Sequence, residues 1–280
     1  MKTIQQRSVD AAVQQACALA AQVLRAHPSA LITDLDGTLS PIVFTPEEAS
    51  VLPGCRRALE GLRDRLDLVA VVSGRPGSEA KGLLGLEGVV YLGNHGLDPW
   101  IGDERPGGLP AGQAGQPAWR GLRAALDELK KSLADQPGLR FEDKGATVSI
   151  HYRAAPDPET ARSLLLAAAA ESAGRHGLAV GEGKMVVELR PSHWAGKGAG
   201  LNELVNSRGL RGLVYLGDDR PDLHAFEVLA QLRQERGLRG LSVGVVGPES
   251  PPELADWADV VLAGPEQVEV FLEELVKALG

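Results

Sequence analysis

The stretch Ala30-Leu31-Ile32-Thr33-Asp34-Leu35-Asp36-Gly37-Thr38-Leu39-Ser40 changes abruptly from an apolar run to two carboxylates and a glycine. This pattern predicts a buried strand that opens into a polar loop. Residues two apart on an extended chain share a face, so Asp34 and Asp36 can point into one space. Neighbouring carboxylates repel each other unless a cation or a shared proton relieves them. We therefore interpret the stretch as a candidate site, and the alternative is an ordinary acidic turn, in which Asp-Gly is common.

Three further apolar runs end in polar, glycine-containing loops. Residues 66–72 lead into Ser73-Gly74-Arg75-Pro76, residues 89–92 into Gly93-Asn94-His95-Gly96, and residues 213–216 into Gly217-Asp218-Asp219-Arg220-Pro221-Asp222. Strands this apolar are typical of a parallel sheet that helices cover on both faces. Ligands of such sheets bind at the carboxyl ends of the strands. We therefore expect the four loops to share one site, although each taken alone could be a surface turn.

The middle of the chain has a different pattern. Glycine and proline dominate residues 103–117, which is typical of a domain boundary. Beyond it we expect a helix over 119–133, one alternating strand over 139–153 and a strand over 185–189 after the turn Gly181-Glu182-Gly183. Between these strands we expect a helix over 158–176, with Asp157 as its N-cap and Gly177 closing it. The parallel pattern then returns, with a helix opened by Gly196-Lys197-Gly198. The sequence therefore predicts an α/β parallel-sheet core at 1–102 and 192–280, with a smaller α+β cap inserted at 103–191.

Composition limits the classes of partner. The 280 residues include 44% hydrophobic ones and carry a net charge of −8, which argues against nucleic acid or an anionic membrane as the main partner. We expect no signal peptide and no membrane span. The two cysteines, Cys17 and Cys55, have neither metal-site nor disulfide spacing, so we expect a reducing, cytoplasmic compartment. We also expect a monomer.

The motif Asp34-Leu35-Asp36-Gly37-Thr38-Leu39 resembles the first motif of the haloacid-dehalogenase superfamily, D-x-D-G-T-L. Ser73, Lys197 and the acidic loop at 218–222 follow in the order of that superfamily's remaining motifs. The resemblance implies a Rossmann-like core of haloacid-dehalogenase type. It also implies that Asp34 is a nucleophile and that Asp36 is the general acid and base.

The same resemblance implies a phosphate site and a Mg²⁺ site. Mg²⁺ prefers oxygen ligands and keeps several waters, so carboxylates of Asp34 and Asp218 and the carbonyl of Asp36 could hold it. Asp219 and Asp222 would not bind the ion directly but would hold the residues that do. The residues that would bind phosphate are Thr38, Ser73, Gly74 and Lys197.

A wider resemblance, from about residue 30 to residue 226, is to the trehalose-6-phosphate phosphatase family. Four blocks carry it: Gly93-Asn94-His95-Gly96, Glu142-Asp143-Lys144-Gly145 with His151-Tyr152-Arg153, Gly183-Lys184 with Glu188-Leu189-Arg190-Pro191, and Gly217-Asp218-Asp219-Arg220 with Asp222. By position, the residues implied to bind sugar are Asn94, His95, Glu142, Lys144, Arg153 and Glu188. Asp98 and Pro221 depart from the family pattern, in which Glu and Thr are usual.

The expected activity is therefore Mg²⁺-dependent hydrolysis of trehalose 6-phosphate to trehalose and phosphate, through an aspartyl-phosphate, as the final step of trehalose biosynthesis. A phosphatase for another sugar phosphate, of the sucrose or mannosyl-glycerate type, is a close alternative. A phosphomutase shares the core and would need an activating bisphosphate. A non-enzymatic binding protein is disfavoured because every acidic residue of the core motifs is present.

Overall fold

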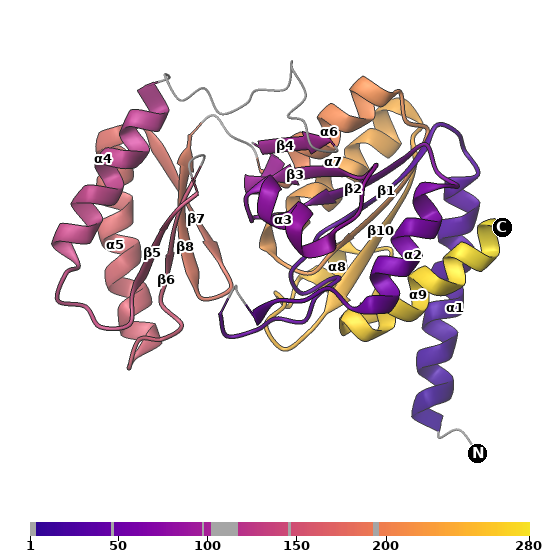
Figure 1. Ribbon diagram of the computed structural model, residues 1–280, viewed down its shortest axis with the longest axis horizontal. Coiled ribbons are helices and arrows are strands. Elements are labelled where there is room, and N and C mark those ends of the chain that lie inside the picture. Colours follow the sequence, from indigo (N-terminus) through magenta and orange to yellow (C-terminus); the bar gives the residue numbers. More distant parts are fainter. Residues whose placement is uncertain (1–3, 46–47, 97, 102–116, 145–146, 193–195) are drawn as a thin grey trace. The chain divides into compact units, whose positions relative to one another are not determined.

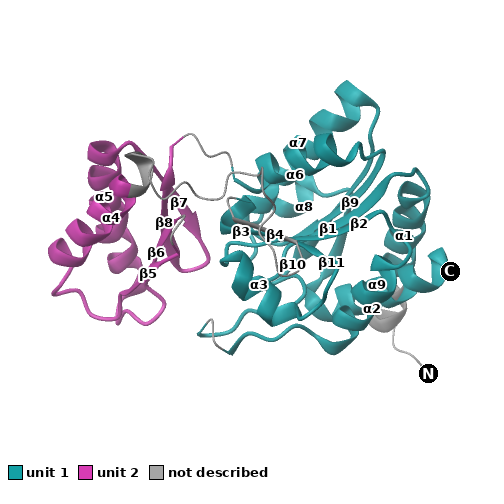
Figure 2. Cartoon of the chain, turned by 45° about the horizontal axis from the view of Figure 1, so that its top comes forward, with its two compact units in different colours: residues 1–106, 196–280 teal, residues 107–195 magenta. Residues whose placement is uncertain are grey.

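The computed structural model of the chain describes residues 4–45, 48–96, 98–101, 117–144, 147–192 and 196–280. The chain divides into two compact units, Met1–Pro106 with Gly196–Gly280 (unit 1) and Gly107–Ala195 (unit 2), so the second is inserted within the first (Figure 2). Most of the boundary predicted over 103–117 lies outside the described residues. The predicted limits 103 and 191 therefore stay predictions.

The described part of unit 1 contains a seven-stranded sheet in the order β11-β10-β9-β1-β2-β3-β4 (Figure 1). Adjacent strands are parallel, as the apolar runs predict, except that β4 runs antiparallel to β3. Strand β4 was not among the predicted elements. The bounds are β1 Ser29–Thr33, β2 Leu68–Val72, β3 Val90–Gly93, β4 Asp98–Ile101, β9 Gly212–Gly217, β10 Arg239–Val246 and β11 Val260–Ala263.

Helices cover both faces of this sheet. One face packs against α1 Ile4–Leu24, α2 Pro53–Arg63, α3 Gly77–Leu84 and α9 Gly264–Leu279, and the other against α6 Lys197–Arg208, α7 Arg220–Arg236 and α8 Leu254–Trp257. Because strand residues alternate between faces, Leu31 joins the first core, with Leu59 and Phe271, while Ile32 joins the second, with Phe226. Each such side chain contributes about 1.5–3 kcal/mol on burial, so β1 is held rigidly.

Unit 2 is an antiparallel four-stranded sheet, in the order β5-β6-β8-β7, with two helices on one face. Its helices are α4 Pro117–Ser132 and α5 Pro158–His176, and its strands are β5 Arg140–Asp143, β6 Val148–His151, β7 Leu178–Gly183 and β8 Val186–Pro191. The predicted limits of α5 are confirmed: Asp157 caps its start by accepting from the amide of Thr160, and Gly177 closes it with a φ of 65°. Leu126 and Leu165 meet Ile150 and Val187 in the core.

Two predicted elements of unit 2 are wrong. The single strand expected over 139–153 is a hairpin of β5 and β6, in which the Lys144 amide donates to the Thr147 carbonyl. Alternation of side chains continues through both arms, so it does not reveal the turn between them. The Gly181-Glu182-Gly183 segment lies within β7 rather than in a turn, and the chain reverses after it, at Lys184 and Met185. Each error hides one strand, so the predicted sheet has two strands where the structure has four.

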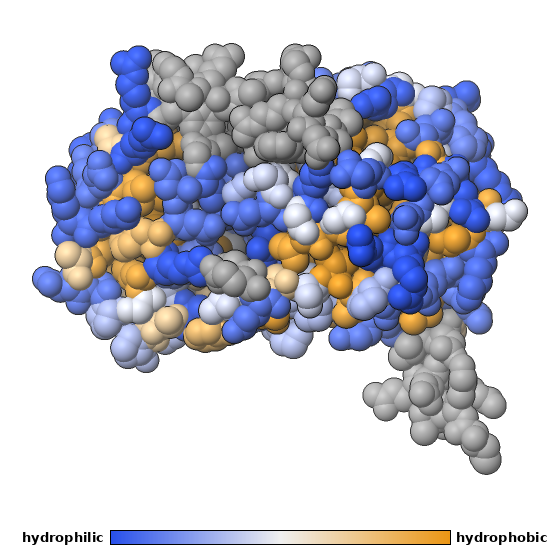
Figure 3. Space-filling model, in the orientation of Figure 1, coloured by the Kyte–Doolittle hydropathy of each residue, from blue (hydrophilic) through white to orange (hydrophobic). Residues whose placement is uncertain are grey.

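The surface of the protein is largely hydrophilic on the face shown in Figure 3, with small apolar patches between polar side chains. Large hydrophobic side chains that are exposed include Phe44 and Trp257. Within the described residues, every helix is too short or too polar to cross a lipid bilayer.

Candidate active site

The candidate site lies at the carboxyl edge of the unit 1 sheet, where the sequence predicts it. Asp34 directly follows β1 and Asp218 directly follows β9, and these two strands are hydrogen-bonded neighbours. Ser73 follows β2, the strand on the other side of β1, and Asn94 follows β3. The parallel order of the strands therefore brings four separate loops to one edge.

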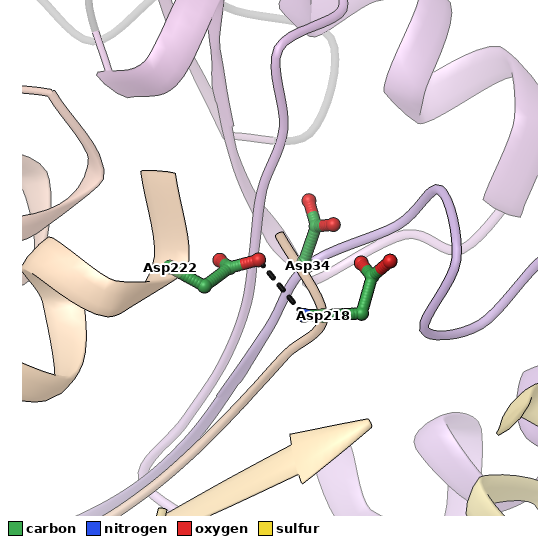
Figure 4. Close-up of side chains that lie close together, drawn as sticks. All are labelled: Asp34, Asp218 and Asp222. Atoms are coloured by element: carbon green, nitrogen blue, oxygen red, sulfur yellow. Dashed lines mark hydrogen bonds between the residues drawn. The ribbon is translucent and has the colours of Figure 1, made fainter. Parts of the chain in front are cut away.

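Three buried carboxylates meet at the centre of the site. One oxygen from each of Asp34, Asp218 and Asp222 lies within 4.8 Å of the other two, and Figure 4 shows the side chains next to one another. Gly37 leaves room for them, because a Cβ at this position would lie 2.0 Å from Oδ2 of Asp218. Its φ of +90° also favours glycine. The glycine after the two aspartates is therefore required by both the turn and the cluster.

Asp222 is fully occupied by hydrogen bonds. Its Oδ1 accepts from Nζ of Lys197 at 2.9 Å and from the hydroxyl of Tyr215 at 2.7 Å, and its Oδ2 accepts from the amides of Asp218 and Asp219 at 2.9 and 3.0 Å. The bond from the Asp218 amide is drawn in Figure 4. With both oxygens used in this way, Asp222 holds the loop after β9 and Lys197 in place.

Lys197, the first residue of α6, is buried among three carboxylates. Its Nζ lies 2.9 Å from Oδ1 of Asp34, 2.9 Å from Asp222 and 3.3 Å from Asp219. Burial lowers the pKa of Lys197, but the carboxylates together outweigh burial and hold this pKa well above its usual range. Lys197 is therefore a fixed cation beside Asp34.

The carboxyl groups of the cluster crowd one another around a single lysine. Burial raises the pKa of Asp34 well above its usual range; Lys197 opposes this, and the charges of Asp222 and Asp218 add to it. Burial likewise raises the pKa of Asp222 to about 6, against the effect of Lys197. The neighbouring carboxyl groups thus disfavour one another's ionisation, and a divalent cation would relieve this repulsion by binding their oxygen atoms.

The side chain of Asp36 is held by a residue that the predicted site did not include. Nε and Nη2 of Arg75 donate to its two oxygens at 2.7 and 2.8 Å, a bidentate ion pair. Arg75 lies in the Ser73-Gly74-Arg75-Pro76 loop, so its place after β2 was visible in the sequence, but its partner was not. Tyr215 was missed too, because it reads as one more apolar residue of β9.

The predicted phosphate-binding residues are all present at this edge, with partners of their own. The Thr38 hydroxyl donates to Oδ1 of Asp218 at 3.2 Å, and Oγ of Ser73 accepts from the Arg75 amide at 3.1 Å. Gly74 packs under the ring of His95, since a Cβ there would lie 2.9 Å from Cε1 of the ring. The site thus joins the loops after β1, β2, β3 and β9.

Asn94 and His95 form a strained turn after β3. Their φ values of 49° and 56° lie in the left-handed region, which costs roughly 1–2 kcal/mol for each non-glycine residue. The amide of Asn94 donates to the carbonyl of Arg75, and that of His95 to the carbonyl of Ser73. These two hydrogen bonds fix the turn to the loop after β2, so the loops after β2 and β3 are joined on one side of the site.

The other predicted sugar-binding residues lie in unit 2. Register places Glu142 opposite Ser149 and Ser149 opposite Glu188, in one row across β5, β6 and β8. Glu188 accepts from the hydroxyls of Thr147 and Ser149, both at 3.2 Å, and Lys144 lies 3.9 Å from it.

Further contacts complete this polar face. Nε2 of His151 lies 2.8 Å from Oε2 of Glu142, and this hydrogen bond is the main cause that lowers the pKa of Glu142. Arg153 follows β6 and is half-buried. The face of the unit 2 sheet turned away from its helices therefore carries an ordered set of charged and hydroxyl groups, including Thr147, Ser149 and His151, which the predicted site did not contain.

Comparison with known proteins agrees with this architecture. The trehalose-phosphatase family model matches residues 32–246. Trehalose-phosphate phosphatase of Mycobacterium tuberculosis is 33% identical over 270 residues, which cover 95% of this chain and 65% of that protein. A probable trehalose-phosphate phosphatase of Oryza sativa subsp. japonica is 31% identical over 280 aligned positions, covering 91% of this chain and 72% of the relative. The chain thus spans about two thirds of the length of these relatives.

Solved structures share the fold. The C-terminal domain of Candida albicans trehalose-6-phosphate phosphatase superposes with a TM-score of 0.77 at 23% identity, covering 93% of this chain and 96% of that one. A trehalose-6-phosphate phosphatase related protein superposes with a TM-score of 0.67 at 25% identity, covering 89% and 97%. The expected parallel-sheet α/β core with a separate cap is therefore confirmed.

Proposed function

Because this chain belongs to the trehalose-phosphatase family, we propose that it hydrolyses trehalose 6-phosphate to trehalose and inorganic phosphate, the final step of trehalose biosynthesis. The observation that carries the proposal is the ion pair of Asp34 and Lys197. A carboxylate at the carboxyl end of a central strand, held 2.9 Å from a buried ammonium, suits attack on a phosphate whose charge the ammonium neutralises.

The chemistry proceeds in two steps. An oxygen of Asp34 attacks phosphorus, the bond from phosphorus to the sugar oxygen breaks, and Asp36 gives its proton to that leaving oxygen. Water then attacks the phosphorus of the aspartyl-phosphate, Asp36 takes the proton of the water, and phosphate leaves Asp34 free again. Charge on the other phosphate oxygens is balanced by Lys197 and by the donors at Thr38, Ser73 and Gly74.

Arg75 holds Asp36 in one orientation. Each oxygen of Asp36 accepts one hydrogen bond from the guanidinium, so the side chain must turn away from Arg75 to reach a leaving oxygen elsewhere. We propose that Arg75 stores Asp36 beside the site and releases it when a phosphate binds. The dianion offers Arg75 a competing bidentate partner.

Mg²⁺ fits the carboxylates of Asp34 and Asp218, which lie close together, better than that of Asp222, whose two oxygens already accept two hydrogen bonds each. The Asp36 carbonyl is the third ligand of the proposal. When bound, the ion relieves the repulsion between the carboxyl groups of the cluster and polarises the phosphoryl group. Asp219 supports the site by binding Lys197.

Sugar-binding roles are proposed for polar groups of each unit, taken separately. Asn94 and His95 are proposed contacts from unit 1, and Glu142, Lys144, Arg153 and Glu188 from unit 2. Ordered carboxylates and an ammonium on a sheet face suit sugar hydroxyls, which both donate and accept hydrogen bonds. Both cysteines are buried and free, which supports a reducing compartment, and we propose a cytoplasmic monomer.

A substrate panel with and without Mg²⁺ tests this function. Phosphate release is measured for trehalose 6-phosphate, sucrose 6-phosphate, mannosyl-glycerate phosphate and glucose 6-phosphate. We expect trehalose 6-phosphate to give a kcat/KM at least tenfold above the others, and EDTA to abolish release. A higher value for another sugar phosphate would reassign the substrate, and isomerised hexose phosphate without release would indicate a mutase.

The metal proposal has a separate test. Asp218→Ala removes one of two protein carboxylates from a hard cation, so the Mg²⁺ concentration for half-maximal turnover should rise at least tenfold. Arg220→Ala, which changes an exposed neighbour outside the cluster, is the matched control and should leave it unchanged. An unchanged midpoint in Asp218→Ala would contradict the ligand role.

A further inference from the structure

A second charged hollow lies in unit 1, at the amino edge of the sheet. It measures about 650 Å³, within the range of roughly 300–1,000 Å³ typical of small-molecule sites. The chain reaches it at the end of α1, the end of α6, the start of β9, the end of α7 and the start of β10. Because Asp34 and Asp218 follow the carboxyl ends of β1 and β9, this hollow is at the opposite edge from the candidate active site.

Every charged side chain that lines the hollow is basic. The lining contains Arg25, His27, Arg211, Arg236 and Arg239 and no Asp or Glu. The whole chain is acidic, with 37 Asp and Glu against 29 Lys and Arg, so a local set of this kind is not a consequence of composition. A concave basic site concentrates small anions.

The arginines are not neutralised by the protein. In the part of the chain that the structure describes, no carboxylate lies within ion-pair distance of Arg25, Arg211 or Arg239, while Arg236 binds the amide oxygen of Asn206. His27 is paired with Asp67 at 2.7 Å. The guanidinium groups are exposed and can turn towards a ligand.

Helix ends alone do not explain these charges. Helices α1, α6 and α7 end at the hollow, and each end carries about half a unit of negative charge, roughly 1.5 units in all. Four arginines exceed this. Arg211 and Arg239, moreover, are not in helices: they lie side by side at the starts of β9 and β10, where the Arg239 amide donates to the Arg211 carbonyl at 2.9 Å.

We propose that this hollow, lined by Arg25, Arg211, Arg236 and Arg239, binds a small molecule with two or more phosphate groups, such as a nucleoside polyphosphate. Guanidinium groups pair with phosphate oxygens in a bidentate manner, and four of them match a ligand of multiple charge better than a monophosphate. The concave shape and limited volume favour a small ligand over a nucleic acid, which would need an extended basic surface. The site is independent of the proposed phosphatase activity.

The same elements connect the hollow to the catalytic edge. Helix α6 begins at Lys197 and ends at Arg208, α7 begins beside Asp219 and ends at Arg236, and β9 leads from Arg211 to Asp218. A ligand at the hollow therefore touches the ends of the segments that hold the carboxylate cluster.

Calorimetric titration with inorganic triphosphate in EDTA and low salt tests the proposal. We expect binding to the parent protein, and at least tenfold weaker binding to Arg211→Gln/Arg239→Gln. The double variant Arg120→Gln/Arg123→Gln, which removes two exposed arginines of α4, is the control of equal charge and should change the affinity less than twofold. Any triphosphate at the catalytic edge contributes equally to all three proteins.

Hydrolysis of p-nitrophenyl phosphate by each variant checks the fold, and we expect it within twofold of the parent. Should the first pair fail to fold, Arg25→Gln/Arg236→Gln should show the same loss of binding. ATP and inorganic phosphate are titrated in parallel; ATP binding as tightly as triphosphate, with phosphate much weaker, supports a polyphosphate site. The proposal is overturned if triphosphate does not bind to the parent, if it binds equally to the parent and to Arg211→Gln/Arg239→Gln, or if the control variant weakens binding as much. It is also overturned if the parent binds RNA but not triphosphate, and Arg211→Gln/Arg239→Gln loses the RNA binding.

Discussion

Strands β1, β2 and β9 of unit 1 are buried along their whole length, whereas β8 of unit 2 alternates between buried and half-buried residues. The charged groups of the two units differ in the same way. In unit 1 one carboxylate, Asp222, takes four hydrogen bonds and fixes Lys197 beside Asp34. In unit 2, Glu142 and Glu188, whose side chains are 21% and 12% exposed, share a sheet face with hydroxyls and a histidine. The core holds its charges in one buried geometry, while the inserted unit carries its polar groups on a partly exposed sheet face.

This contrast predicts that the largest effect comes from the core nucleophile. Asp34→Asn keeps the shape of the side chain but loses the attacking oxygen, so kcat should fall at least about ten-thousandfold, roughly 5 kcal/mol of barrier. Phosphate release measures this, and thermal unfolding should remain close to that of the parent. Activity within about tenfold of the parent would remove Asp34 from the nucleophile role.

A core residue that touches no substrate should show its effect in stability. Asp222→Ala removes the buried acceptor of Tyr215 and of two amides and one of the three carboxylates around Lys197, at a cost of about 3–5 kcal/mol. Urea unfolding checks this figure. Glu188→Ala, on the partly exposed sheet face of unit 2, is the control and should lose far less. An equal loss of unfolding free energy in the two variants would contradict the proposed difference between the units.

The unit 2 residues should instead affect selectivity. Glu188→Ala should lower kcat/KM for trehalose 6-phosphate by roughly ten- to a thousandfold, about 1.4–4 kcal/mol for lost hydrogen bonds to a charged group. Hydrolysis of p-nitrophenyl phosphate, which cannot reach a sugar site, should change little. Equal loss on both substrates would indicate damaged chemistry or folding, and no loss on either would return Glu188 to an ordinary surface role.

The smallest effect concerns pH. The hydrogen bond with His151 holds the pKa of Glu142 below its usual value of 4.5, so the pair stabilises the protein above pH 4.5 and this contribution disappears as the pH falls through the lowered pKa. His151→Ala should therefore cost about 1 kcal/mol at pH 6 and progressively less below pH 4.5. Urea unfolding at several pH values measures the difference. If the difference in unfolding free energy between the parent and His151→Ala is the same at every pH, then packing of His151, and not its hydrogen bond with Glu142, causes the loss.

The sequence by itself determined the core and the order of its loops. Apolar runs that stop at Asp34, Ser73 and Asp218 define parallel strands with polar carboxyl ends, because only strands buried on both faces are apolar throughout. The cap and stop signals at Asp157 and Gly177 fixed α5, since they act on backbone groups within one turn. Both kinds of signal are local and can be read along the chain.

The tertiary structure alone decided the partners of the charged groups. The pairing of Arg75 with Asp36 and of Tyr215 with Asp222, and the row formed by Glu142, Ser149 and Glu188, follow from strand order and register. Register is set by how whole faces pack, and a side-chain period of two continues unchanged through a tight hairpin. Charged residues far apart in the chain therefore show that a site exists, but which of them meet is a property of the folded sheet.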